Sequence, residues 1–418
     1  MKTIISDLYQ FDRQLMGSGY DSALTYINHL IPLQILQFPT GTKLGTWTVP
    51  EEWVVYEAWV KKGKKKILDY NKDKLSLVVG SIPFEGKVDK QELLKHLHYS
   101  DVKTDAFSYE QKLYEKDWGF TLPKEMVYRT EDGKSVDNLP DGEYEVCIKT
   151  EYKPGVMKVG VHTIPGKTDQ EILLFAHLDH AWLANDNLSG VACLIDLVRH
   201  IKPFENEHTI KLIFCPQTIG SIAYALTQDI SMVSFVLALD SIGNSNVDGI
   251  LLHRSFDKEN RINHIAHLAL RHAGEGFRHA PFRSTIGSDE YAFNDPKIGI
   301  PGIMLSTHPY PEYHTSKDTP ETINYAVIEK VQKIIIKMIQ YYERDFIPVP
   351  TFKGPLFRSG FGIQSKGSGF NMAWDYLIYE MGTKPLSTLC LDFGLNFEYT
   401  EELLGKLGDA IERRPVAR

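Results

Sequence analysis

Two patterns of hydrophobic and polar positions alternate along residues 171–342. Short apolar runs with the length of buried parallel strands occupy residues 173–175, 211–216 and 232–240. Amphipathic stretches with the spacing of helices occupy residues 191–201, 262–272 and 326–342. This alternation of strand and helix predicts an α/β fold, in which helices cover both faces of an open sheet.

The segments before this region have different patterns. Residues 1–38 carry a helical apolar stripe that Gly17 and Gly19 interrupt, which predicts two packing helices. In residues 39–149, aromatic and β-branched residues alternate with Gly and Pro, which predicts a mainly β module. We expect its tryptophans to be core residues or, alternatively, a wall over the functional site: Trp47, Trp53, Trp59 and Trp118.

The last region, residues 347–418, opens with a Pro- and Gly-rich linker. Three short helical patterns follow, and their spacing predicts a small winged-helix-like unit. Such units often bind DNA, but this one carries many acidic and few basic side chains, so a duplex would be repelled. We expect the unit to serve in packing or oligomerisation, which allows a homo-oligomer.

Composition narrows the class of protein. The chain of 418 residues is 43% hydrophobic and 24% charged, the proportions of a globular protein. A net charge of −8 argues against a dedicated nucleic-acid binder, which usually carries a basic patch. The four cysteines are widely spaced, the N-terminus lacks the apolar core of a signal peptide, and no apolar run is long enough to span a bilayer. We therefore expect a cytoplasmic protein with no membrane partner and no disulfide framework.

Polar groups that suit a metal ion follow the predicted strands. His177, Asp179 and His180 come at the end of the first strand, and Asp186 follows in a turn-rich Asn-Asp-Asn. Further candidates lie downstream: Gln217, Asp240, Asp289, Glu290 and His314. Open α/β sheets bind ligands at the carboxyl ends of their strands, and histidine nitrogens with carboxylate oxygens suit Zn²⁺. Asp186 lies between ligand candidates, where a carboxylate could anchor one ion or bridge two.

Each of these residues also has an ordinary explanation when taken alone. A single His-x-Asp is usually a loop, Asp240 would be a strand-end carboxylate, and Asp289-Glu290 a loop or helix-capping pair. Five other histidines are expected at the surface or on helices: His253, His264, His267, His272 and His279. The combination of groups, and not any one of them, points to metal chemistry.

The order of these motifs resembles that of the M28-type zinc aminopeptidases. Five motifs carry the resemblance: His177-Leu178-Asp179, residues 185–190 (NDNLSG), residues 240–243 (DSIG), residues 288–293 (SDEYAF), and residues 313–315 (YHT) with Asp318-Thr319. Five motifs in the right order are far more specific than any one of them. The resemblance implies an aminopeptidase-like open mixed sheet flanked by helices.

Within this group, the chain is more similar to bacterial aminopeptidase-like proteins of the DUF4910 and DUF2172 type, which are often linked with polysaccharide biosynthesis. The matching segments are PTGTKLGTWTVPEEW, KDWGF, PQTIGSIAY and PEYHTSKDT. The resemblance implies that a β-rich domain at 39–149 is inserted between two core segments, 1–38 and 150–346. It also implies a winged-helix-like domain in residues 347–418.

The resemblance further implies roles for single residues. The implied zinc ligands are His177 or His180, Asp186 as the central or bridging group, Asp240 and His314. Asp179 would orient a metal-bound histidine, as carboxylates beside metal sites often do. Asp289 and Tyr313 are expected to contact substrate.

One departure from the family pattern concerns catalysis. The zinc aminopeptidases place a Glu-Glu pair, which supplies the general base and a metal ligand, where this chain has Gln217-Thr218. A glutamine amide does not accept a proton at neutral pH, and a threonine is a poor replacement for a carboxylate ligand. Three outcomes stay open: Glu290 supplies the base or a ligand, one zinc ion suffices in place of two, or hydrolysis is lost and the pocket only binds.

The leading hypothesis is a metal-dependent hydrolase of the aminopeptidase type. It would cleave an amide or peptide bond near the free amine of a small peptide or amino-acid amide. In the second hypothesis, which Gln217 favours, the protein is a catalytically impaired pseudo-peptidase that binds a small molecule. The third is amide chemistry on an amino sugar in polysaccharide biosynthesis.

Overall fold

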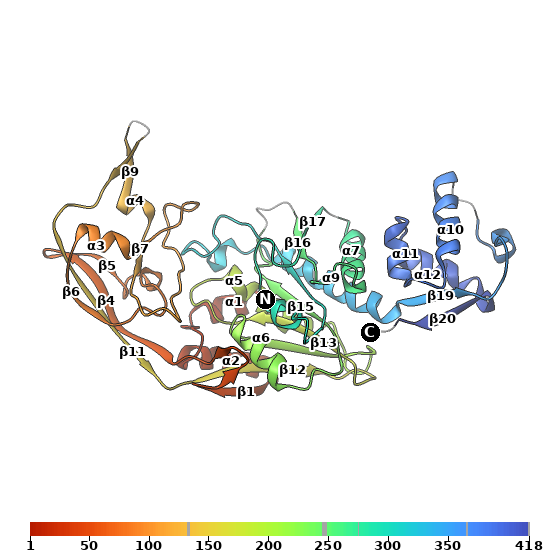
Figure 1. The fold of residues 1–418 in the computed structure, drawn as a ribbon, viewed down its shortest axis with the longest axis horizontal. Helices are drawn as coiled ribbons and strands as arrows, with labels where there is room; N and C mark the ends of the chain where they lie inside the picture. Colours follow the sequence, from red (N-terminus) through yellow and green to blue (C-terminus); the bar gives the residue numbers. More distant parts are fainter. Residues whose placement is uncertain (132–133, 245–248, 275, 365–366, 417–418) are drawn as a thin grey trace.

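An eight-stranded mixed sheet forms the centre of the protein in the computed structural model, which describes residues 1–131, 134–244, 249–274, 276–364 and 367–416 (Figure 1). In spatial order its strands are β1 (Gln34–Pro39), β12 (Val156–Ile164), β14 (Thr209–Cys215), β13 (Glu171–His177), β15 (Val233–Asp240), β18 (Gly302–Ser306), β16 (Ile250–His253) and β17 (Phe277–Ala280). The four central strands β14, β13, β15 and β18 are parallel, whereas β1, β12 and β16 join antiparallel. The predicted α/β class and open mixed sheet are confirmed.

Helices cover both faces of this sheet. On one face lie α1 (Lys2–Tyr9), α2 (Ser18–Leu30), α5 (Asn185–Leu197), α7 (Arg261–His272) and α9 (Tyr325–Arg344), and on the other α6 (Ile219–Thr227) and α8 (Glu290–Phe293). Leu174 of β13 packs into the first core, and Leu173 and Phe175 pack into the second. Successive side chains of a strand point to opposite faces, so a strand covered on both sides reads as a continuous apolar run.

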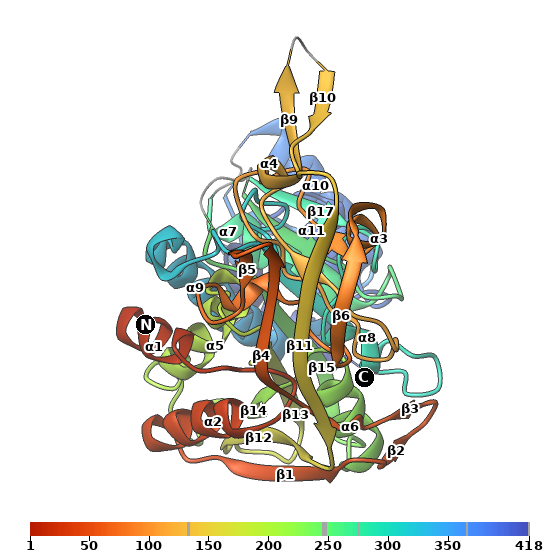
Figure 2. The ribbon, with the colours of Figure 1, turned by 90° about the vertical axis from the view of Figure 1, so that its left-hand side faces the viewer.

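A second sheet dominates the β-rich segment, as Figure 2 shows from that end of the molecule. Its order is β5 (Lys65–Asp69), β4 (Glu52–Lys62), β11 (Glu143–Lys153) and β6 (Phe84–Asp89), all antiparallel. The smaller elements around it are β2 (Lys43–Leu44), β3 (Trp47–Thr48), η1 (Lys74–Ser76), α3 (Lys90–Lys95), β7 (Leu97–His98), β8 (Phe120–Thr121), α4 (Lys124–Val127), β9 (Tyr128–Glu131) and β10 (Lys134–Asp137).

The tryptophans of this segment divide between the two predicted uses. Trp53 and Trp118 are buried in its hydrophobic core. Trp59 is half-buried and carries the Lys61 ammonium 3.8 Å above its ring. Trp47 packs instead against the core of the large sheet and lines a cavity beside the candidate site. The boundaries 39 and 149 of the inserted domain stay a prediction.

A third unit follows α9 and lies at the opposite end of the molecule from the β-rich segment (Figure 1). It consists of β19 (Phe346–Pro350), η3 (Arg358–Phe361), α10 (Ser368–Glu380), α11 (Leu386–Asp392), α12 (Phe397–Gly405), η4 (Gly408–Ala410) and β20 (Ile411–Pro415). β19 and β20 pair antiparallel. Asp345 at the end of α9 accepts hydrogen bonds from the Ser387 amide and hydroxyl, at 2.9 and 2.7 Å, which ties the unit to the core. Its winged-helix identity stays a prediction.

Among the helices of the described residues, none combines the length and the apolar composition that a membrane span requires. The expected cytoplasmic location, the homo-oligomer and the absence of a nucleic-acid partner stay predictions.

His253 does not have the surface or helix position that we expected. It ends β16 and is fully buried, with Nε2 3.2 Å from the Thr285 hydroxyl. Within the described chain its Nδ1 has no hydrogen-bond partner. Burial, together with the neighbouring His308 and Arg278, lowers the pKa of His253 to about 4. Its position in the strand was hidden because the run 250–253 was not recognised as a strand, which lies between β18 and β17.

We expect a His253→Leu variant to lose less stability in acid than the wild type. The pKa of His253 in the folded protein, about 4, lies below the ordinary 6.5. The neutral ring therefore makes its full contribution to folding stability above pH 6.5, and this contribution is lost as the pH falls toward 4. Full protonation of the buried ring would cost about 3 kcal/mol. Melting curves at about pH 7.5 and about pH 5 measure the effect, with the exposed His29→Leu as control. An equal fall in melting temperature between the two pH values in the wild type and in His253→Leu would contradict this prediction.

Candidate metal centre

Three neighbouring parallel strands deliver the candidate residues to one edge of the sheet. His177 ends β13, Gln217 follows the end of β14, and Asp240 ends β15. β13 pairs with both β14 and β15 in parallel, so their carboxyl ends meet. The loop after β13 adds Asp179 and His180, and Asp186 comes at the start of α5.

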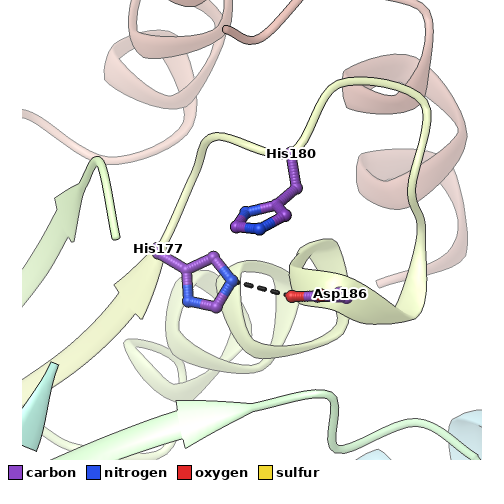
Figure 3. Close-up of side chains that lie close together, drawn as sticks. All are labelled: His177, His180 and Asp186. Carbon is purple, nitrogen blue, oxygen red and sulfur yellow. Dashed lines mark hydrogen bonds and ion pairs between the residues drawn. The ribbon is translucent and has the colours of Figure 1, made fainter. Parts of the chain in front are cut away.

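The start of α5 is a turn before it is a helix. Asp186 (φ −103°, ψ 92°) and Asn187 (φ −134°, ψ 36°) have non-helical backbones, and regular helix follows. The predicted turn at Asn-Asp-Asn is therefore present, although the helix was expected only from residue 191. This turn directs the Asp186 carboxylate toward the end of β13, as Figure 3 shows.

The carboxylate of Asp186 lies between two imidazoles. Its Oδ1 is 2.8 Å from Nε2 of His177, and its Oδ2 is 3.0 Å from Nε2 of His314. The His180 ring completes the group, with its centroid 5.0 Å from that of His177 and 5.4 Å from that of His314. One ligand atom from each of His177, His180 and Asp186 lies within 4.8 Å of the others (Figure 3).

Charge is concentrated in this buried cluster. Burial by itself would raise the pKa of Asp186, but His180, His177 and His314 hold that pKa well below its usual value. Burial by itself would lower the pKa of His177, yet Asp240 and Asp186 raise it to about 10. The carboxylates around His177 thus favour its protonated, positively charged form. A divalent cation could supply the same positive charge, since metal binding displaces protons from such ligands.

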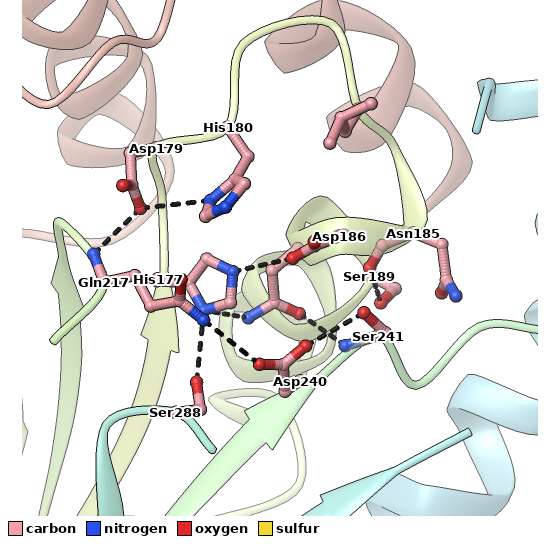
Figure 4. A network of polar contacts seen from close by, with 12 residues as sticks. His177, Asp179, His180, Asn185, Asp186, Ser189, Gln217, Asp240, Ser241 and Ser288 are labelled. Atoms are coloured by element: carbon pink, nitrogen blue, oxygen red, sulfur yellow. Dashed lines mark hydrogen bonds and ion pairs between the residues drawn. The ribbon is translucent and has the colours of Figure 1, made fainter. Parts of the chain in front are cut away.

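Asp240 accepts hydrogen bonds from two neutral donors. The Gln217 side-chain amide donates to its Oδ2 at 3.4 Å, and the Ser241 hydroxyl donates to its Oδ1 at 2.9 Å (Figure 4). A glutamate at position 217 would bring a second negative charge to this contact.

The residues around the cluster fix its imidazoles. Asp179 accepts the backbone N–H of Gln217 at 2.9 Å, and its Oδ1 is 3.6 Å from Nδ1 of His180. The amide nitrogen of Asn187 is 3.2 Å from Nδ1 of His177 and donates to the Leu239 carbonyl at 2.7 Å (Figure 4). These contacts lock the ring orientations on which ligand geometry depends.

Several of these residues have unusual backbones. His180, Thr218, Ser241 and His314 have φ of 70°, 64°, 54° and 51°, a region that non-glycine residues seldom occupy. Such conformations cost on the order of 1 kcal/mol each and persist where surrounding contacts demand them, often at functional sites. Their concentration around Asp186 supports the interpretation of the cluster as a functional site.

Asp318 fixes the turn that carries Asp186. It is fully buried and accepts the backbone N–H of Asn185 at 2.6 Å and of Asp186 at 3.1 Å. The Tyr310 hydroxyl also donates to it, at 3.1 Å. Asp318 belongs to one of the sequence motifs, but the motif did not reveal that its acceptors are directed at this turn.

Arg13 is a second supporting residue, and sequence patterns did not reveal it. It lies between α1 and α2, is fully buried, and donates from Nη1 and Nη2 to four carbonyls at 2.7 to 3.1 Å: Leu178, Asp179, His180 and Leu183. Burial lowers the pKa of Arg13 to about 10, so the guanidinium stays charged at neutral pH. One side chain thus holds most of the loop that carries Asp179 and His180.

Asp289 and Glu290, two further candidates from the sequence, are both buried. Asp289 accepts the Thr218 N–H at 3.0 Å and lies 3.9 Å from Nδ1 of His177, and burial raises its pKa to about 6. Glu290 is fully buried and accepts the Ser288 N–H at 3.0 Å. Burial raises the pKa of Glu290 to about 8, and within the described residues its side chain makes no ion pair with the imidazoles. A base role for Glu290 does not follow from this arrangement.

The β-rich segment forms the wall opposite the strand ends. The Tyr109 ring centroid is 4.9 Å from that of His180 and 5.4 Å from that of His314, and its N–H donates to the His314 carbonyl at 2.7 Å. Tyr313, expected to contact substrate, stacks on His314 with ring centroids 4.0 Å apart. A cavity of about 500 Å³ lies between the two parts, with Asp179, Gln217 and Thr218 on one side and Trp47, Gln111, Lys112, Leu113, Tyr114 and Glu115 on the other.

Comparisons with known proteins agree with this architecture. A family model described as "Domain of unknown function (DUF4910)" matches residues 2–345. A Clostridium acetobutylicum protein named "Putative polysaccharide biosynthesis protein with aminopeptidase-like domain" is 28% identical over 347 residues, or 82% of this chain and 77% of the relative. The crystal structure of a "putative peptidase" from the same organism has a TM-score of 0.77 at 24% identity, over 99% of this chain and 95% of that one.

Zinc peptidases share the fold at lower identity. BSAP, a zinc aminopeptidase from Bacillus subtilis, has a TM-score of 0.60 at 14% identity, over 81% of this chain and 93% of its own. A peptidase M28 precursor from Shewanella amazonensis SB2B has a TM-score of 0.56 at 14% identity, over 81% of this chain and 92% of its own. At such identities the likeness shows the fold, which is aminopeptidase-like as the motifs implied.

We expect an Arg13→Met variant to lose about 3 kcal/mol or more of folding stability, because four buried carbonyls lose a charged donor. Arg13→Lys keeps the charge but not the planar fork, so it should recover only part of the loss. Chemical denaturation measures the stability, and hydrogen exchange measures the backbone of residues 178–183. Unchanged exchange in this loop in the Met variant would contradict the role assigned to Arg13.

Proposed function

We propose that this chain, which belongs to the DUF4910 family, is a metal-dependent hydrolase of the aminopeptidase type. It would cleave an amide or peptide bond in a small substrate that carries a free amine. The observation that carries the proposal is the buried Asp186 carboxylate between His177 and His314, beside His180. The neighbouring Asp179 and Gln217 line a cavity of about 500 Å³. The aminopeptidase-like fold supports it.

The proposed cofactor is zinc, held by His177, His180, Asp186 and His314, with Asp240 beside them. Imidazole nitrogens and carboxylate oxygens are the donors that zinc prefers. The negative charge of the buried Asp186 carboxylate and the raised pKa of His177 favour a cation here. When bound, zinc polarises a substrate carbonyl and lowers the pKa of a bound water.

We favour one ion over two. A second site of the usual kind needs the carboxylate that Thr218 lacks, and the oxygens of Asp240 are engaged by Gln217 and Ser241. Gln217 would then position Asp240 and would not accept a proton, because an amide is not a base at neutral pH. Asp179 would hold the His180 ring and would face the substrate from the cavity wall.

Two other functions remain proposals. The contact between the Gln217 amide and Asp240 favours a pseudo-peptidase that binds a small molecule without turnover. The name of the Clostridium acetobutylicum relative favours amide chemistry on an amino sugar in polysaccharide biosynthesis. Zinc binding without hydrolysis of any amide would support the first of these over the leading proposal.

The wild type is expected to bind about one equivalent of zinc after chelator treatment and reloading, and to hydrolyse aminoacyl-p-nitroanilides only when loaded. Asp186→Asn removes the central charge, so zinc affinity should fall by about 100-fold or more. Metal analysis and competition with a fluorescent chelator measure this, with the exposed Asp169→Asn as the matched control. Wild-type protein that retains no zinc would overturn the metal proposal.

A Gln217→Glu variant is expected to turn over the same substrates at least about 10-fold faster, because it restores a proton acceptor beside the cluster. Gln111→Glu is the matched control, since Gln111 lines the same cavity from the opposite wall. Steady-state kinetics of both variants with zinc loaded give the comparison. A gain in both variants, or in neither, would mean that position 217 does not limit the reaction.

A further inference from the structure

Arg283 lines the same cavity as Gln217 and Thr218, from the segment between β17 and α8. Its guanidinium carbon is 4.3 Å from the centroid of the Tyr291 ring, a cation–π contact that holds the planar group over the ring face. Tyr291 lies on α8 and lines the cavity as well. Arg283 is exposed, and this contact favours one position of its guanidinium in the absence of ligand.

Gly287 provides the room for this arrangement. A Cβ built at Gly287 would lie 3.0 Å from Cζ and 3.1 Å from Nη1 of Arg283, tighter than most real Cβ contacts. An alanine at position 287 would therefore shift the guanidinium by a few tenths of an ångström. Arg283 itself has a φ of 51°, a conformation that non-glycine residues seldom adopt.

The N–H donors of the Arg283 guanidinium are not used by acceptors of the described residues. Across the described chain, Arg283 forms no ion pair and donates no hydrogen bond to a protein acceptor. The other cation of the cavity lining, Lys112, is already paired with Asp117. An arginine offers five N–H donors in a planar fork that matches a carboxylate with two parallel hydrogen bonds. The cavity thus contains one preorganised and unused anion-binding group.

We propose that Arg283 binds a carboxylate of the substrate, so that the substrate is a short dipeptide-like amide with a free acid at one end. This inference deepens the proposed function and rests on it for the scissile amide. Glu115 and Asp179 also line the cavity, and their negative charges favour a monoanionic carboxylate over a phosphate dianion. The substrate would present its amide to the cluster and its acid to Arg283.

The test compares alanyl-glycine with alanyl-glycinamide, which differ only in the terminal charge. Zinc-loaded wild type is expected to prefer the free acid by about 10- to 100-fold in kcat/KM, the range of a charge-assisted hydrogen-bonded pair. In Arg283→Leu this ratio should fall to about one, and Arg283→Lys should keep part of it. Gly287→Ala, which displaces the guanidinium, should lower the ratio with the arginine still present. Arg199→Leu, on an exposed surface arginine, is the matched control and should keep the ratio.

Binding of uncleavable analogues separates this inference from the proposed function. Calorimetry of the reduced-amide analogues of both compounds needs no turnover, so a preference for the acid that Arg283→Leu abolishes would support the inference even in a protein that hydrolyses nothing. Hydrolysis without any preference for the acid would overturn the inference and leave the proposed function standing. Tighter binding of the corresponding phosphonate would overturn the choice of carboxylate. An equal loss of both compounds in Arg283→Leu would show a structural role only and would also overturn it.

Discussion

Burial of the Asp186 carboxylate is the constraint on which the rest of the site depends. An ionised carboxylate taken from water into the protein interior must find compensating charge and hydrogen bonds, or it takes up a proton. Here His177 and His314 face its two oxygens, and Asp318 binds its backbone N–H. These partners come from a strand end and from a loop late in the chain, so the carboxylate can be buried only when these segments have met.

Residues from more distant parts of the chain also hold the side chains around Asp186 in place. Arg13 holds the loop after β13 through four carbonyls, although it belongs to the N-terminal segment. Asn187 joins the His177 ring to β15 by binding the Leu239 carbonyl. Tyr109, from the β-rich segment, packs over His180 and His314. Contacts from several segments hold the side chains of the cluster in place, and well-positioned ligands are what metal binding requires.

Gln217 affects metal binding and hydrolysis in different ways. Its amide donates to Asp240 at the position where the zinc aminopeptidases that the sequence resembles carry a Glu-Glu pair. A neutral donor there leaves Asp240 without a second acid beside it. The same change removes a proton acceptor from the cavity wall. Metal binding and a shaped cavity can thus persist in a protein whose rate of hydrolysis depends on another group.

The sequence by itself determined the α/β class, the mixed sheet and the edge at which the site lies. Apolar runs that are buried on both faces predict parallel strands, and the carboxyl ends of parallel strands meet, which brings His177, Gln217 and Asp240 together. Only the tertiary structure decided that Arg13 supports the loop, that Glu290 faces the Ser288 backbone, and that Arg283 lies over Tyr291. The local pattern sets which side chains share a face, whereas partners from distant segments depend on how those faces pack.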